Sequence, residues 1–147
     1  MVLKLEESET KKDIEVVISY SERNSIVERI ASFVKSLDSQ VECHFDGGVK
    51  LVNASDIYYV EVIDRKTIVF CEDESYQIKN YLYQVLDKLE SSGFIQINKY
   101  CILNINKLTK INTLYNSHLE AILSNGKCLN VTRNYLAGIK RLLLEDK

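Results

Sequence analysis

The sequence predicts an α+β fold that is mostly antiparallel β and is preceded by a small βαβ-like unit. From about residue 49 to the end of the 147-residue chain, short runs of β-branched and aromatic residues alternate with turn residues, which is typical of strands. Two segments of this part repeat apolar residues every three or four positions, which predicts one helix mid-way and one at the C-terminus. Before residue 49, a strand-like, a helix-like and a second strand-like pattern follow one another. We therefore expect two parts, residues 1–48 and residues 49–147.

In the N-terminal part, residues 14–20 (IEVVISY) place apolar side chains on one side of a predicted strand. Ser21 is expected to cap the helix that follows, because a serine oxygen can accept a hydrogen bond from a first-turn N–H group. Residues 41–45 predict the second strand, which ends at the turn Asp46-Gly47-Gly48. The stripe expected to face the core consists of Ile26, Ile30, Phe33, Val34 and Leu37.

In the main part, residues 57–63 and 67–72 predict a hairpin whose tip, residues 64–66, is basic. A helix is expected over residues 78–89, and Gly93 lies just beyond its end.

The C-terminal third should be a run of strands closed by a helix. Residues 94–113 read as successive strands, and Asn125-Gly126 lies between two alternating runs, which is the strongest short-range hairpin signal. Thr132 is expected to cap the final helix.

Charge is unevenly divided along the chain. Residues 93–147 carry eight bases and three acids, a net charge of +5, whereas residues 1–92 carry 11 bases and 18 acids, a net charge of −7. A basic face on the C-terminal part, of the kind that binds nucleic acid, is therefore permitted despite the overall charge of −2.

Several functional classes are disfavoured by the residues themselves. The chain has two histidines, no nucleophile motif and no glycine-rich phosphate loop, so we expect neither an enzyme nor a bound cofactor. Its four cysteines form no C-x-x-C pair, so we expect no metal site. No run approaches the roughly 20 apolar residues of a membrane helix, and no signal-peptide stretch is present, so we expect a cytoplasmic protein.

Three motifs in order carry a resemblance to a known family. They are DIYYVE at residues 56–61, GFIQINKYCILN at residues 93–104, and Asn125-Gly126 followed by VTRNYL at residues 131–136. In this order and spacing they resemble the LytTR family of bacterial DNA-binding domains, from about Lys50 to the C-terminus. The resemblance implies a protein that binds promoter DNA without a helix-turn-helix, through loops and a helix start that enter successive major grooves. The 49 residues before the match are too few for a receiver domain, so we expect a stand-alone regulator.

The resemblance also implies which residues contact DNA. The family's middle motif usually reads His-Arg-Ser and its final motif Val-Ser-Arg-Arg-Tyr, so Asn98 and Asn134 depart from the pattern and weaken its positive charge. The implied contact residues are Arg65, Lys66, Asn98, Lys99, Tyr100, Thr132, Arg133 and Asn134.

The chemistry of two positions supports this assignment independently. Arg133 directly follows a helix cap, where free N–H groups and the helix dipole favour a phosphate, and its guanidinium can also pair with guanine. Lys99 supplies a point charge beside Asn98, whose amide can read base edges. By contrast, Arg65 and Lys66 alone would be an ordinary solvated turn.

The leading hypothesis is therefore a transcriptional regulator that binds double-stranded promoter DNA, with no small-molecule substrate. We expect a homodimer held by the N-terminal strand and helix, and a membrane protein or another regulatory partner could control it. The alternative is a protein-interaction or dimerisation module with vestigial DNA binding, which the acidity of residues 1–92 favours.

Overall fold

The computed structural model describes residues 1–114 and 118–144. Its helices are α1 (Ser25–Asp38), α2 (Leu82–Leu89) and α3 (Arg133–Leu144), with short 3-10 turns η1 (Ala54–Asp56), η2 (Glu90–Ser92) and η3 (Ile105–Lys107). Its strands are β1 (Gln40–Phe45), β2 (Gly48–Asn53), β3 (Tyr59–Ile63), β4 (Lys66–Phe70), β5 (Ser75–Ile78), β6 (Phe94–Asn98), β7 (Cys101–Asn104), β8 (Leu108–Thr113), β9 (Leu119–Leu123) and β10 (Cys128–Val131).

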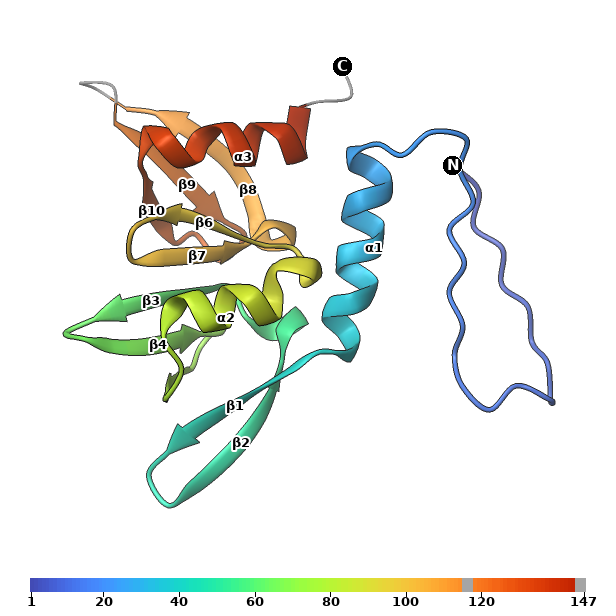
Figure 1. Ribbon diagram of the computed structural model, residues 1–147, viewed down its shortest axis with the longest axis horizontal. Helices are drawn as coiled ribbons and strands as arrows, with labels where there is room; N and C mark the ends of the chain where they lie inside the picture. The colour runs from blue at the N-terminus through green and yellow to red at the C-terminus, as the bar shows by residue number, and fades with distance from the viewer. Residues whose placement is uncertain (115–117, 145–147) are drawn as a thin grey trace.

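The strands form two sheets (Figure 1). Seven strands form the larger sheet, in the order β2-β1-β5-β4-β3-β7-β6, and the smaller sheet has the order β10-β9-β8. Neighbouring strands in both sheets pair antiparallel, as in β3 with β4 and β9 with β10. The predicted α+β class, mostly antiparallel β with a middle helix and a C-terminal helix, is confirmed.

Two apolar clusters pack the helices against the two sheets. Val85 and Leu89 of α2 are buried in one cluster, against side chains of the seven-stranded sheet. Ile139 of α3 is buried in the other cluster, which contains residues of both sheets. Gly93 has a φ of +92°, which a glycine adopts without strain, and a Cβ there would lie 3.1 Å from the Ser32 Oγ of α1. This close approach brings α1 against the start of β6.

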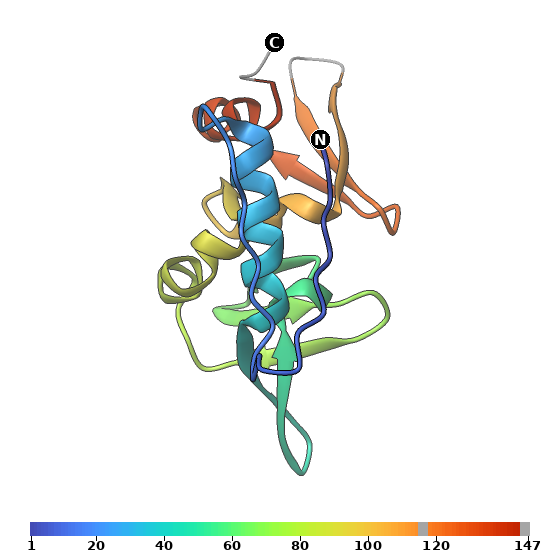
Figure 2. The same cartoon turned by 90° about the vertical axis from the view of Figure 1, so that its right-hand side faces the viewer.

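The predicted strand over residues 14–20 is wrong. Residues 1–24 contain neither helix nor strand, and Ile14 is 95% exposed. Figures 1 and 2 show this N-terminal arm as an extended loop beside α1. Alternating apolar residues form a strand only where a neighbouring strand accepts their backbone hydrogen bonds, and the arm has no such neighbour among the described residues.

The helix cap and the apolar stripe also differ from the prediction. Asn24, and not Ser21, is the N-cap of α1, since its side chain accepts a hydrogen bond from the Val27 N–H at 3.0 Å. The predicted core stripe is largely outside the core, because Ile26, Phe33 and Leu37 are about half exposed.

The N-terminal part is continuous with the main sheet. β1 pairs with β2 along its whole length and meets β5 at His44 and Gln77. The expected βαβ-like unit is therefore absent, and a boundary at residue 48 would divide the β1–β2 hairpin. A separate regulatory or dimerisation role for residues 1–48 stays a prediction.

Candidate nucleic-acid interface

The first predicted contact segment is the β3–β4 hairpin tip. Asp64 and Arg65 have φ values of 52° and 65°, so both central residues of this two-residue turn are left-handed. That geometry matches the right-handed twist of the flanking strands and is typical of the tightest hairpins. The side chains of Arg65 and Lys66 are both exposed at the tip.

The second segment is the β6–β7 tip, where the strand register shifts between Gln96 and Asn98. The Tyr100 N–H donates to the Asn98 Oδ1 at 2.8 Å, which closes the tip. The Lys99 Nζ lies 5.6 Å from the centre of the Tyr100 ring, and both side chains are exposed. A cation over an aromatic face at this distance is mildly attractive, so the ring orients the lysine.

The third segment is the start of α3. Thr132 lies just before the helix, its N–H donates to the Ile97 carbonyl at 3.0 Å, and its own carbonyl accepts from the Tyr135 N–H at 3.0 Å. The first bond attaches the helix start to β6, and the second closes the first turn of α3. Arg133 and Asn134 then occupy the first turn with exposed side chains, as the sequence predicts.

Hydrogen bonds join the three segments into one surface. The Asn98 Nδ2 donates to the Asn130 carbonyl at 2.7 Å, which links the β6–β7 tip to the strand that leads into α3. The Val62 N–H donates to the Tyr100 carbonyl at 2.9 Å, which links the same tip to the β3–β4 hairpin. All three lie along the left side of Figure 1. We call this surface the loop edge; it comprises Arg65, Lys66, Asn98, Lys99, Tyr100, Thr132, Arg133 and Asn134.

The loop edge carries concentrated positive charge. Arg65, Lys66, Lys99 and Arg133 are exposed there, and none of them has an ion-pair partner among the described residues. Four cations on three segments that are hydrogen-bonded to one another can bind a polyanion whose charges are spaced along a line.

Asn98 has a structural role that the sequence analysis does not predict. Both polar atoms of its side chain already have backbone partners, the Oδ1 with Tyr100 and the Nδ2 with Asn130. It therefore positions the tip, and the reading of a base edge by its remaining N–H stays a prediction. The sequence carries a signal for this, since an asparagine side chain in a tight turn commonly bonds the backbone two residues later.

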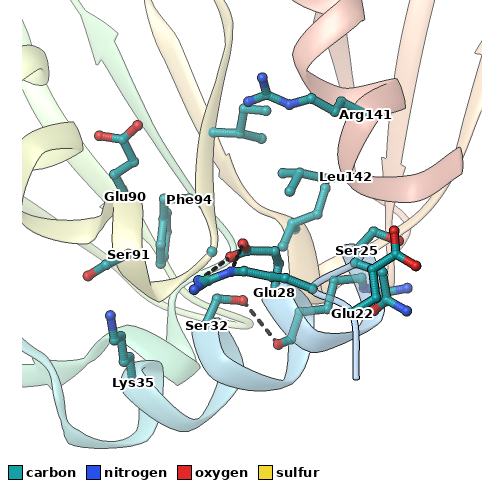
Figure 3. A pocket seen from close by; sticks show the side chains of 16 residues that line it. Glu22, Ser25, Glu28, Ser32, Lys35, Glu90, Ser91, Phe94, Arg141 and Leu142 are labelled. Atoms are coloured by element: carbon teal, nitrogen blue, oxygen red, sulfur yellow. Dashed lines mark hydrogen bonds and ion pairs between the residues drawn. The ribbon is translucent and has the colours of Figure 1, made fainter. Parts of the chain in front are cut away.

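A cleft lies on the side of the molecule opposite the loop edge. Its volume is about 990 Å³, and Figure 3 shows its lining side chains, which come from α1 and the residues before it, from η2, from the start of β6 and from α3. At its rim the Arg23 Nε donates to Glu28 at 2.5 Å, and this hydrogen bond lowers the pKa of the Glu28 carboxyl. The described residues contain no cluster of three metal-ligating side chains and no helix that could span a membrane.

Residues 47–144 match the LytTr DNA-binding domain family, which covers about two thirds of the chain. The chain belongs to the LytTR family. This family is a DNA-binding one and not an enzyme family, so a DNA-binding domain is confirmed. The match begins at the β1–β2 turn and excludes the arm, α1 and β1.

A solved structure and curated relatives agree with this assignment. The LytTr DNA-binding domain of a methyl-accepting/DNA response regulator from Bacillus cereus has a TM-score of 0.66 and 26% identity, and covers 72% of this chain and 97% of that domain. Sensory transduction protein LytT from Bacillus cereus is 32% identical over 115 residues, which are 75% of this chain and 47% of that protein. The chain thus spans about half the length of that LytT relative.

Another relative is similar to this chain over more of its own length. An uncharacterised HTH-type transcriptional regulator from Staphylococcus aureus is 26% identical over 122 residues, which are 82% of both proteins. A match of 122 residues is longer than the family match, so the similarity extends beyond the LytTR domain.

Proposed function

We propose that this LytTR protein is a cytoplasmic, sequence-specific transcriptional regulator that reads major grooves of promoter DNA through its loop edge. The observation that carries the proposal is the set of four exposed cations on three segments that hydrogen bonds hold together. A surface assembled from loops can place side chains into grooves without a recognition helix, because phosphate contacts set the register and a few base contacts supply specificity.

The contact residues divide by chemistry. Lys66 and Lys99 are flexible point charges and suit phosphates. Arg133 lies in the first turn of α3, where backbone N–H groups point outward, and its planar guanidinium can pair with both acceptors of a guanine. Asn98 and Thr132 hold these cations in place through the backbone. We therefore assign phosphate contacts to the lysines and the main base contact to Arg133.

The small size of the loop edge favours two copies of the chain bound side by side on DNA. The loop edge offers only three short segments, near the low end of what a single DNA-binding module buries. A second copy on an adjacent site would double the contacts and the specificity.

The experiment is selection of bound fragments from random duplex DNA by the full chain. Enrichment of one motif, with binding that weakens at higher salt, is the expected outcome. The matched control is Arg65→Ala, Lys66→Ala, Lys99→Ala and Arg133→Ala combined, which should enrich nothing. If the native chain enriches no motif, the alternative of an interaction module with vestigial DNA binding replaces this proposal.

A further inference from the structure

Helix α1 buries two serines beside Val27 and exposes three of its large apolar residues. Ser36 is 1% exposed and Ser25 is also buried, whereas Ile26, Phe33 and Leu37 are 47%, 48% and 55% exposed. An amphipathic helix on a globular protein normally turns its apolar stripe to the core. The body of this molecule therefore leaves the side of α1 that carries Ile26, Phe33 and Leu37 largely uncovered.

These exposed side chains, together with the half-buried Ile30, have the spacing of a helix–helix seam. Ile26, Ile30, Phe33 and Leu37 are separated by four, three and four residues, which are alternating d and a positions of a heptad repeat. A narrow seam of this kind is typical of coiled-coil pairing, in contrast to the wider stripe of a helix that packs on a sheet. The seam runs the length of the 14-residue helix.

We propose that α1 is a dimerisation helix, which packs antiparallel against α1 of a second copy of this chain. The proposal identifies the surface that joins the two copies proposed above. The 4-3-4 spacing is symmetric about its midpoint. A twofold axis there places Ile26 of one copy against Leu37 of the other and Ile30 against Phe33, so the seam is self-complementary.

The charges of α1 favour a second copy over a strongly charged partner. The helix carries Glu28 and Asp38 against Arg29 and Lys35, so its net charge is zero. An acidic or basic partner would gain no electrostatic attraction from this helix, whereas two identical neutral helices experience no net repulsion.

The size of the seam indicates a reversible dimer to which the arm contributes. Fourteen helical residues are about 21 Å long, and a pair this short buries less than the roughly 800 Å² per partner of a standard interface. Residues 13–20 of the arm, if extended, span about 26 Å, enough to lie along the seam. Val16, Val17 and Tyr20 are exposed there and can add apolar area.

A dimer through α1 leaves the loop edge accessible to DNA. Figure 1 places α1 on the side of the molecule away from the loop edge, and Figure 2 shows α1 and the arm together on that side. A dimer through α1 therefore covers none of the loop-edge residues.

Sedimentation of the full chain over a range of concentrations tests the proposal. The native chain should populate dimers, and Phe33→Glu or Leu37→Glu should raise the dimer dissociation constant at least tenfold, since each buries an unpaired charge. Tyr83→Glu is the matched control, because Tyr83 is a 65% exposed aromatic residue on α2 and should leave dimerisation unchanged. A native chain that is monomeric at all concentrations overturns the proposal. So does a dimer that the α1 variants weaken no more than the control.

Mixing two variants tests the antiparallel register. Ile26→Lys and Leu37→Glu should each be monomeric alone. An equimolar mixture of the two should form heterodimers, because the introduced lysine and glutamate face each other at one end of the helix pair. The other end of the pair stays apolar. In a parallel pair neither charge would meet the other, so absence of mixed dimers contradicts the register. Both variants should keep native circular dichroism and still bind a single-site duplex. Dimerisation without any DNA binding would refute the proposed function only, and binding by a strict monomer would refute this inference only.

Discussion

Arg65 combines a left-handed backbone with a proposed contact to DNA. Its φ of 65° lies in the left-handed region, where a side chain other than glycine or asparagine is disfavoured. The sequence predicts a basic turn here but does not reveal that an arginine occupies the strained position. A charged, exposed side chain in a conformation that glycine would adopt freely is consistent with a requirement for the guanidinium at the loop edge.

Replacing Arg65 with glycine should separate stability from binding. Arg65→Gly relieves the left-handed conformation, so thermal unfolding should show a gain of about 0.5–1 kcal/mol. The same variant should bind the selected duplex more weakly, because it removes a cation. Arg65→Ala, which keeps the strain and removes the charge, is the control and should lose affinity without the gain in stability. A destabilised Arg65→Gly protein would show that strain is absent from this turn.

The two loop-edge lysines should act on the DNA backbone. Lys66→Ala or Lys99→Ala should weaken binding to every duplex alike and reduce the slope of log affinity against log salt by about one unit. Titrations of selected and scrambled duplexes at several salt concentrations measure this. If one base position alone is affected and the salt slope stays unchanged, the lysines read bases and the phosphate assignment is wrong.

At the scale of elements, local signals were sufficient for some strands and helices and insufficient for others. Asn125-Gly126 predicts the β9–β10 hairpin because the turn needs a residue with positive φ, and Gly126 supplies it at +87°. Thr132 predicts the start of α3 for a similarly local reason. The arm was predicted wrongly because a strand needs a pairing partner, and alternation within residues 14–20 contains no information about one. The apolar spacing predicts α1 as a helix, but the expectation that its stripe faces the core is wrong, because spacing alone does not show what covers a stripe.

The pairing of β3 with β4 contains a buried phenol whose ionisation should limit stability at alkaline pH. Tyr59 stacks on Phe70 with ring centres 4.4 Å apart, and burial raises the pKa of Tyr59 to about 12. An unfolded tyrosine ionises near pH 10. The contribution of the protonated Tyr59 to the free energy of unfolding is therefore complete below pH 10 and is lost as the pH rises towards 12. The loss should be on the order of 2 kcal/mol.

Tyr59→Phe isolates this contribution, because it keeps the stacked ring and removes the ionising group. Urea unfolding of both proteins at pH 8 and at pH 11 gives the comparison. The difference in unfolding free energy between the two proteins should shift in favour of the variant at the higher pH. An unchanged difference would mean that Tyr59 is accessible to hydroxide in the folded protein.

At the scale of the whole molecule, the two sheets position three distant segments of the chain on one edge. The motif order predicts which residues belong to that edge, because resemblance to a family implies the fold of that family. It does not predict which hydrogen bonds join the segments. The bonds of Asn98 to Asn130 and of Thr132 to Ile97 connect residues that are more than 30 positions apart, and only the folded structure reveals them. For the same reason the location of α1, opposite the loop edge, could not be predicted from the sequence.

The most direct test of the loop edge as the DNA-reading surface is the effect of Arg133→Lys on a selected and a scrambled duplex at one salt concentration. Lysine keeps the charge and loses the two-pronged geometry, so the variant should lose roughly 1–3 kcal/mol on the selected duplex and bind the scrambled duplex normally. Arg141→Lys, at the exposed far end of the same helix, is the matched control and should behave as the native protein on both. An Arg133→Lys protein that binds the selected duplex normally, or that loses affinity equally for both duplexes, would contradict the account.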